Sequence, residues 1–172
     1  MSATINSPAP DFALADLHGD IHHLAEARGR IAVVNFWSAE CRWCEQADPE
    51  ILAMREQWGP QVMLFTLAPN PNESRQQWLD AVARHGIPFI LPDPGQRITA
   101  AYGAEITPHL FVVDAGGILR YAGAYNDVTF RKRQADINYL KEAVEALLRG
   151  ELPAVQQTPP YGCAIVRGGE SD

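Results

Sequence analysis

The chain of 172 residues is long enough for one domain with a hydrophobic core and short for two. Its net charge of -7, with no basic run longer than three residues, argues against a general nucleic-acid-binding role. No apolar stretch reaches the roughly 18 residues that a membrane span requires.

Apolar runs typical of strands alternate with amphipathic helical patterns along most of the chain. Such alternation indicates a sheet with a parallel centre, and the turn Asp114-Ala115-Gly116-Gly117 between two late strands indicates an antiparallel hairpin at its edge. The expected fold is α/β, with a central mixed sheet flanked by helices. In chain order the sequence predicts a strand at 11–14, a turn at 16–20, a buried strand at 31–37, a helix from the cysteines to Trp58, a strand at 61–68, a helix at 73–85, a strand at 88–91, a short helix at 96–102, strands at 110–113 and 118–121, and a helix at 136–149.

The last part of the chain differs in character from the rest. Residues 151–172 contain three prolines and three glycines and show no hydrophobic period. We therefore expect residues 1–150 to form one domain and residues 151–172 to be an extended tail rather than a second domain.

The chain has three cysteines: Cys41, Cys44 and Cys163. A small, odd number of cysteines does not form a disulfide framework. The C-x-x-C spacing of the first two fits a redox pair or half of a zinc site. A closed zinc site needs two further ligands, and the histidines form no second cluster, so we expect no metal.

The polar first ten residues lack the pattern of a secretory signal peptide, which predicts a cytoplasmic protein, or a periplasmic one if a leader has been removed.

The C-x-x-C pair follows a buried strand directly and opens the next helix. Unpaired N–H groups and the helix dipole favour an anion at this position, and such sites lower a thiol pKa from about 8.5 toward about 3.5–7.5. The resulting thiolate is the attacking species in disulfide exchange. Arg42 adds a nearby positive charge. Cys41 is thus the expected nucleophile, and Cys44, one turn further into the helix, the resolving thiol.

The run NFWSAECRWC resembles the active-site strand and turn of the thioredoxin superfamily. Pro49 matches the proline that kinks the first active-site helix of that family, and Thr107-Pro108 matches its cis-proline loop. The opening PAPDFALADLHG resembles the redoxin branch, and the resemblance covers about residues 8–150. It implies a thioredoxin-like fold with an N-terminal strand extension, and with a strand–helix unit inserted between the cysteines and Pro108.

The resemblance also implies the activity of a redoxin-type thiol–disulfide oxidoreductase, which needs no cofactor beyond its own redox-active disulfide. Its partners would be a protein or small-molecule disulfide or thiol, together with a reductant or an oxidant. We expect Pro108 to be cis and to face the disulfide. The candidate site then comprises Cys41 and Cys44 as the catalytic pair, Trp37, Arg42, Trp43, Thr107 and Pro108 as substrate-binding or supporting residues, and Cys163 as an accessory thiol.

Two departures from the family pattern bear on the chemistry. The dipeptide between the cysteines is Arg42-Trp43, without the proline or histidine common in the family, so the redox potential stays open. Asn35 stands where thioredoxin has a buried acid that is credited with moving a proton at the inner cysteine. An amide cannot take that role, which leaves a water molecule, Glu40, or a slow proton-transfer step.

Two other classes of function compete with this interpretation. A peroxiredoxin-like peroxide reductase would use Cys41 within the pattern P-x-x-x-[TS]-x-x-C. Ser38 fits the hydroxyl position of that pattern, but Val34 replaces the proline. The third class is a non-catalytic binding module of the same fold, which an intact C-x-x-C makes less attractive.

Cys163 lies in the tail segment TPPYGCAIVR, which is similar to a C-terminal motif in a group of bacterial redoxin-domain proteins. An extended chain spans about 3.3–3.6 Å per residue, so the tail is long enough to reach Cys41. Cys163 could then resolve a mixed disulfide or shield the thiolate. Alternatively, the segment packs as an edge strand and the thiol is a small apolar plug.

Overall fold

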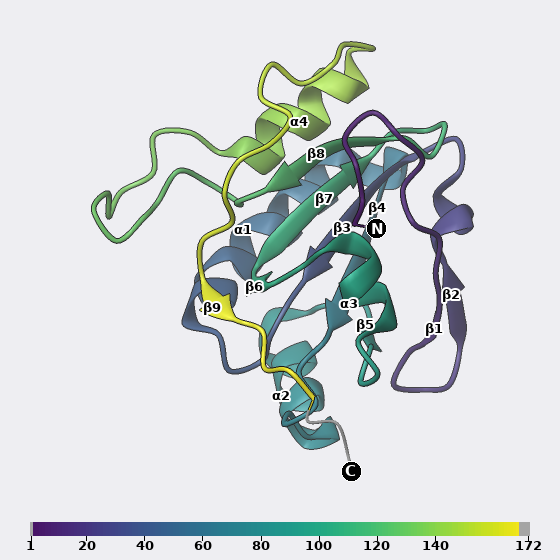
Figure 1. Cartoon of the computed structure of the whole chain (residues 1–172), viewed down its shortest axis with the longest axis vertical. Helices are drawn as coiled ribbons and strands as arrows, with labels where there is room; N and C mark the ends of the chain where they lie inside the picture. The colour runs from purple at the N-terminus through teal and green to yellow at the C-terminus, as the bar shows by residue number, and fades with distance from the viewer. Residues whose placement is uncertain (1, 169–172) are drawn as a thin grey trace.

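The computed structural model describes residues 2–168 and is built on a five-stranded sheet in the order β5-β4-β3-β7-β8 (Figure 1). β3 pairs in parallel with β4 and β4 with β5, whereas β7 pairs antiparallel with both β3 and β8. The expected mixed sheet, with its antiparallel hairpin at one edge, is confirmed. Its strands are β3 (Ile31–Phe36), β4 (Val62–Ala68), β5 (Ile90–Pro92), β7 (His109–Val113) and β8 (Leu119–Gly123).

Both faces of this sheet are covered, because the central strands are apolar on both sides. All six residues of β3 are buried, and successive side chains enter different clusters: Val34 and Phe36 pack on one face and Val33 on the other. One face packs against α1 (Arg42–Trp58) and α4 (Tyr139–Leu148). The opposite face packs against the N-terminal segment and α3 (Arg97–Tyr102).

Local signals in the sequence set the ends of α2 and the end of α1. Ser74 caps α2 (Arg75–His85), because its hydroxyl accepts a hydrogen bond from the Gln77 amide at 3.2 Å. Gly86 ends the same helix in the left-handed conformation, with φ of 72°. α1 ends at Gly59 and passes through a short 3-10 turn, η2 (Gly59–Gln61), into β4.

Several short elements were not predicted or were displaced by a few residues. The first strand, β1 (Ala13–Ala15), forms a hairpin with an unpredicted strand, β2 (Ile21–His23), which leads into η1 (Leu24–Ala27). α4 starts three residues later than expected, because the side chain of Asn138 accepts from the Lys141 amide and so caps the helix there.

The C-terminal segment runs beside the sheet and crosses in front of β6 (Ile106–Thr107), as the yellow ribbon in Figure 1 shows. There it forms β9 (Cys163–Ala164), which pairs antiparallel with β6 in the register Thr107↔Cys163. The expectation for the tail extends to residues 169–172, which lie outside the described residues.

Candidate active site

Cys41 occupies the N-cap of α1, at the junction that the sequence predicts. Its backbone is extended (φ -87°, ψ 114°), and its carbonyl accepts the first helical hydrogen bond from the Glu45 amide at 3.0 Å. Cys44 lies in the first turn of the helix. Both thiols are buried, with 2% and 1% of their surfaces exposed. The free N–H groups of the helix terminus therefore face a thiol that is shielded from water.

Two backbone segments from elsewhere in the chain converge on Cys41. Its Sγ lies 3.2 Å from the carbonyl oxygen of Thr107, in the loop that carries Pro108. The Thr107–Pro108 peptide bond is cis, as expected. The Sγ of Cys163, across the β6–β9 pair, lies 2.9 Å from the Sγ of Cys41. The fold thus gathers all three cysteines at one point.

The three thiols differ strongly in acidity. Hydrogen bonding from the Cys44 thiol, with a smaller contribution from Cys163, lowers the pKa of Cys41 to about 5, although burial opposes this shift. Burial raises the pKa of Cys44 well above its ordinary value, and burial together with the nearby Cys41 raises the pKa of Cys163 to about 11. At neutral pH the site therefore holds a Cys41 thiolate between two protonated thiols.

The dipeptide between the cysteines faces outward. Arg42 is exposed, and its guanidinium carbon lies 4.5 Å from the centre of the Trp43 ring. The sequence suggested that Arg42 would acidify Cys41, but the leading contributions come from the neighbouring thiols. Trp43 is half-buried and packs edge-on against Tyr161 of the tail, with ring centres 5.0 Å apart.

A buried carboxyl group, which the sequence analysis missed, lies one helical turn beyond Cys44. Asp48 is 5% exposed, and its Oδ2 accepts a hydrogen bond from Nε1 of Trp37 at 2.9 Å. Burial raises the pKa of Asp48 to about 7, against the opposing effect of the Trp37 bond. The signal was present in the sequence, since positions i and i+4 of a helix share a face.

Neither Glu40, the side chain that the sequence offers for this role, nor Asn35, at the family's acid position, places a buried carboxyl group beside Cys44. The carboxylate of Glu40 is exposed and accepts a hydrogen bond from the Gln77 side chain at 2.6 Å. Asn35 is buried in β3, and within residues 2–168 its Oδ1 has no hydrogen-bond partner. Asp48 is therefore the acid that the helix itself presents beside Cys44.

Glu73 fixes the loop that precedes Cys41. Its buried carboxylate is hydrogen-bonded by the Ser38 hydroxyl and accepts from the Ala39 amide at 3.2 Å and from Nε1 of Trp78 at 2.8 Å. The hydroxyl that would serve a peroxide-binding motif is thus engaged by Glu73. Sequence reasoning could not find this contact, because 35 residues separate Ser38 from Glu73.

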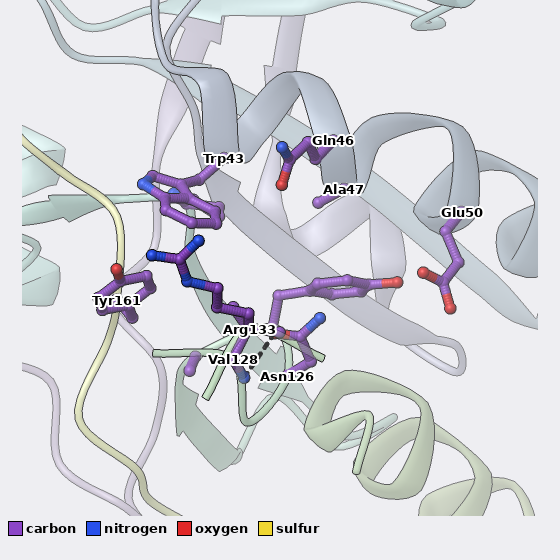
Figure 2. Close-up of a pocket in the computed structure, with 11 residues that line it drawn as sticks. Trp43, Gln46, Ala47, Glu50, Asn126, Val128, Arg133 and Tyr161 are labelled. Carbon is purple, nitrogen blue, oxygen red and sulfur yellow. Dashed lines mark hydrogen bonds between the residues drawn. The ribbon is translucent and has the colours of Figure 1, made fainter. Parts of the chain in front are cut away.

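A pocket opens beside the cysteines, between α1, the loop after β8 and the tail (Figure 2). In this view Arg133 extends toward Trp43 and Tyr161, which form one end of the pocket. Pro108, which follows Thr107 in the chain, also lines it. The remaining lining residues are Gln46, Ala47, Glu50, Ala124, Tyr125, Asn126 and Val128.

No group of three or more His, Cys, Asp or Glu side chains in residues 2–168 is arranged to hold a metal ion. In the same residues, no helix combines the length and the apolar character needed to cross a membrane.

The sequence profile of the AhpC/TSA family matches residues 5–122. A thiol:disulfide interchange protein DsbE from Allochromatium vinosum is 31% identical over 70% of this chain and 66% of its own length. A thiol-disulfide oxidoreductase ResA from Geobacillus thermodenitrificans is 32% identical over 67% of each chain. This chain thus spans about two thirds of the length of these curated relatives. Their names bear out the expectation of an oxidoreductase.

Solved structures share the fold. A hypothetical protein from Sinorhizobium meliloti 1021 is 27% identical, superimposes with a TM-score of 0.85 and covers 98% of both chains. The thioredoxin domain of a thiol-disulfide oxidoreductase from Bacteroides vulgatus is 20% identical, with a TM-score of 0.63 over 77% of this chain and 94% of its own. The expected thioredoxin-like fold is confirmed.

Proposed function

Because the chain belongs to the AhpC/TSA family, we propose that it is a thiol–disulfide oxidoreductase whose redox centre is the pair Cys41 and Cys44. The observation that carries this proposal is the Cys41 thiol at the N-terminus of α1, buried beside Cys44 and acidified by it. A thiolate at neutral pH, with a second thiol in reach, is the minimum equipment for disulfide exchange.

The reaction proceeds in two exchange steps. The Cys41 thiolate attacks one sulfur of a substrate disulfide, forms a mixed disulfide and releases the other substrate sulfur as a thiolate. Cys44 then loses its proton and attacks Sγ of Cys41, which expels the second substrate thiolate and closes a Cys41–Cys44 disulfide. Two electrons pass from the enzyme to the substrate, and a dithiol reductant restores the two thiols. An oxidant role is the same sequence in reverse.

Asp48 is positioned to take the proton of Cys44. Its pKa of about 7 lets it change its protonation state near neutral pH, and it shares a helix face with Cys44. Trp37 holds the carboxylate in place through its indole N–H. The proton acceptor that Asn35 cannot provide is thus supplied from the helix rather than from the central strand.

The remaining predicted residues shape the substrate site. Thr107 and Pro108 form the wall that contacts Cys41, and Trp43, with Arg42 above its ring, forms the outward face next to the pocket. The substrate is a protein or small-molecule disulfide whose sulfur reaches Cys41 along this wall.

Disulfide and peroxide substrates separate the candidate functions. The wild-type protein is expected to accelerate the reduction of insulin by dithiothreitol. The rate at which hydrogen peroxide is consumed should stay at its uncatalysed value. Peroxide consumption that outpaces insulin reduction would favour the peroxide reductase. Inertness toward both substrates would favour a binding module.

The acidity of Cys41 can be measured directly. The rate of its alkylation by iodoacetamide is expected to rise with pH to an inflection near pH 5 and to change little from pH 6.5 to 8, because the thiolate is then fully formed. Peptide mapping at pH 6 should find Cys41 labelled before Cys44 and Cys163. An inflection above pH 8, or earlier labelling of Cys44, would contradict the assignment of the nucleophile.

A further inference from the structure

A short segment of the tail lies across the active site and is anchored on both sides. We call residues 159–164 the strap. Before it, the Thr158 amide donates to the Ala122 carbonyl at 3.1 Å, and the Thr158 hydroxyl accepts from the Ala124 amide at 2.9 Å. After it, the amide of buried Ile165 donates to the Glu105 carbonyl at 2.9 Å. These anchors set the position of the strap relative to Cys41.

The sequence of the strap permits an unusually close approach to the Cys41 loop. A Cβ atom on Gly162 would lie 1.9 Å from the carbonyl oxygen of Thr107, which no side chain tolerates. Glycine at this position lets the strap pair with β6, and the pairing places Sγ of Cys163 at 2.9 Å from Sγ of Cys41. Gly162 and Cys163 therefore act together, the first by allowing contact and the second by presenting a thiol.

The strap also changes which sulfur the solvent can reach. Cys41 and Cys44 are both almost fully buried, whereas Cys163 is only partly buried. Tyr161, two residues before Cys163, packs against Trp43 and closes the side next to the pocket. In this closed arrangement an external thiol meets the sulfur of Cys163 before that of Cys41.

We propose that Cys163 is a third redox thiol, which forms a disulfide with Cys41 and is the sulfur through which external thiols exchange with the enzyme. The inference rests on the proposed disulfide exchange and adds a resolving thiol to it. The geometry that carries it is the strap, in which a glycine-dependent strand pairing directs one sulfur at another.

Disulfide exchange through Cys163 consumes only the substrate disulfide and two external thiols, and it needs no further oxidant. After Cys41 has attacked a substrate disulfide, Cys163 loses its proton and attacks Sγ of Cys41, which releases the second substrate thiolate and forms Cys41–Cys163. An external thiolate then attacks the more exposed Sγ of Cys163 and displaces Cys41 as a thiolate. This step leaves Cys163 joined to the external thiol in a mixed disulfide. A second external thiolate attacks the external sulfur of that mixed disulfide, which forms the external disulfide and releases Cys163 as a thiolate. The acidic Cys41 is the better leaving group, because a low thiol pKa favours departure.

Trypsin places the three cysteines in separate peptides, 31–42, 43–55 and 150–167, so each disulfide identifies itself by mass. In a Cys44→Ser variant treated with oxidised glutathione, the expected product is a disulfide between peptides 31–42 and 150–167, with no glutathione retained. Cys41 that carries glutathione while Cys163 stays a free thiol would overturn the proposal.

Two glycine variants separate positioning from chemistry. Gly162→Ala, made in the Cys44→Ser background, is expected to slow formation of the Cys41–Cys163 disulfide about tenfold or more, because the sulfurs no longer meet. Gly168 lies beyond the strap, where an added Cβ would come no closer than 4.0 Å to another residue, and Gly168→Ala should leave the rate unchanged. Equal rates in the two variants would count against the proposal.

The Cys163→Ser variant tests the role of Cys163 separately from that of the Cys41–Cys44 pair. A Cys163→Ser variant should still close a disulfide between peptides 31–42 and 43–55, while its reduction by glutathione slows about tenfold because the exposed sulfur is gone. Unchanged reduction would refute the role of Cys163 alone. A wild-type protein that forms no disulfide with oxidised glutathione would refute both.

Discussion

Replacing Cys41 with serine is expected to lower the rate of insulin reduction by about 10³-fold or more, to the uncatalysed background. A serine hydroxyl at this position is not ionised at neutral pH, whereas the thiol with a pKa of about 5 is almost entirely thiolate. The measurement is the dithiothreitol-driven precipitation of insulin, with the far-ultraviolet circular dichroism of the variant as a check of folding.

The Gly168→Ala variant is the control for this substitution, because it leaves the site untouched and should retain full activity. A folded Cys41→Ser protein with more than a tenth of wild-type activity would place the nucleophile elsewhere and remove the basis of the proposed mechanism.

Replacing Asp48 with asparagine is expected to abolish part of the pH dependence of stability. The folded state raises the pKa of Asp48 from 3.8 to about 7, so it binds the proton more tightly than the unfolded chain does. Stability from this group is therefore present below pH 4 and is lost as the pH rises to about 7. At about 1.36 kcal/mol per unit, the loss is on the order of 4 kcal/mol as an upper bound.

The neutral amide of the Asp48→Asn variant can still accept the Trp37 hydrogen bond, so the variant should be more stable than the wild type at pH 8 and similar to it at pH 4. The acidified Cys41 produces the opposite slope in both proteins, since its contribution is lost as the pH falls toward 5. Urea unfolding at the two pH values measures the difference.

The same variant should slow disulfide exchange about 10²-fold, because Cys44 loses its proton acceptor. Glu56→Gln, which removes an exposed carboxylate from the same helix, is the matched control and should change neither stability nor rate. An Asp48→Asn protein with wild-type exchange kinetics would refute the proton-acceptor role even if its stability changed as expected.

Local sequence was sufficient for the parts of the fold that depend on short-range physics. The apolar run before the C-x-x-C, the placement of Cys41 at the start of α1 and the end of α2 at Gly86 follow from hydrophobic period and end signals. The short strand β2 was not predicted, because three residues carry too little pattern to distinguish a strand from a turn.

The contacts that complete the site could not be predicted because their partners are distant in the sequence. Glu73 contacts Ser38, and β9 pairs with β6, between segments that lie far apart in the chain. The two-residue strand at Cys163 has no pattern of its own, so the sequence left two alternatives for that thiol. Asp48 could have been predicted, because it follows Cys44 by four residues on the same helix.

A redox titration of the Cys163→Ser variant, in which Cys41 and Cys44 are the only thiols, tests directly whether these two cysteines form a redox couple. Equilibration in glutathione or dithiothreitol buffers, followed by acid trapping and mapping of peptides 31–42 and 43–55, measures the fraction of disulfide at each potential. A Cys41–Cys44 redox couple should give a single reversible two-electron transition, with a tenfold change in the equilibrium constant for about 30 mV. A midpoint near about -270 mV would indicate a reductant, and one near about -120 mV an oxidant. If Cys41 and Cys44 remained free thiols across this whole range, they could not be the redox centre proposed for this protein.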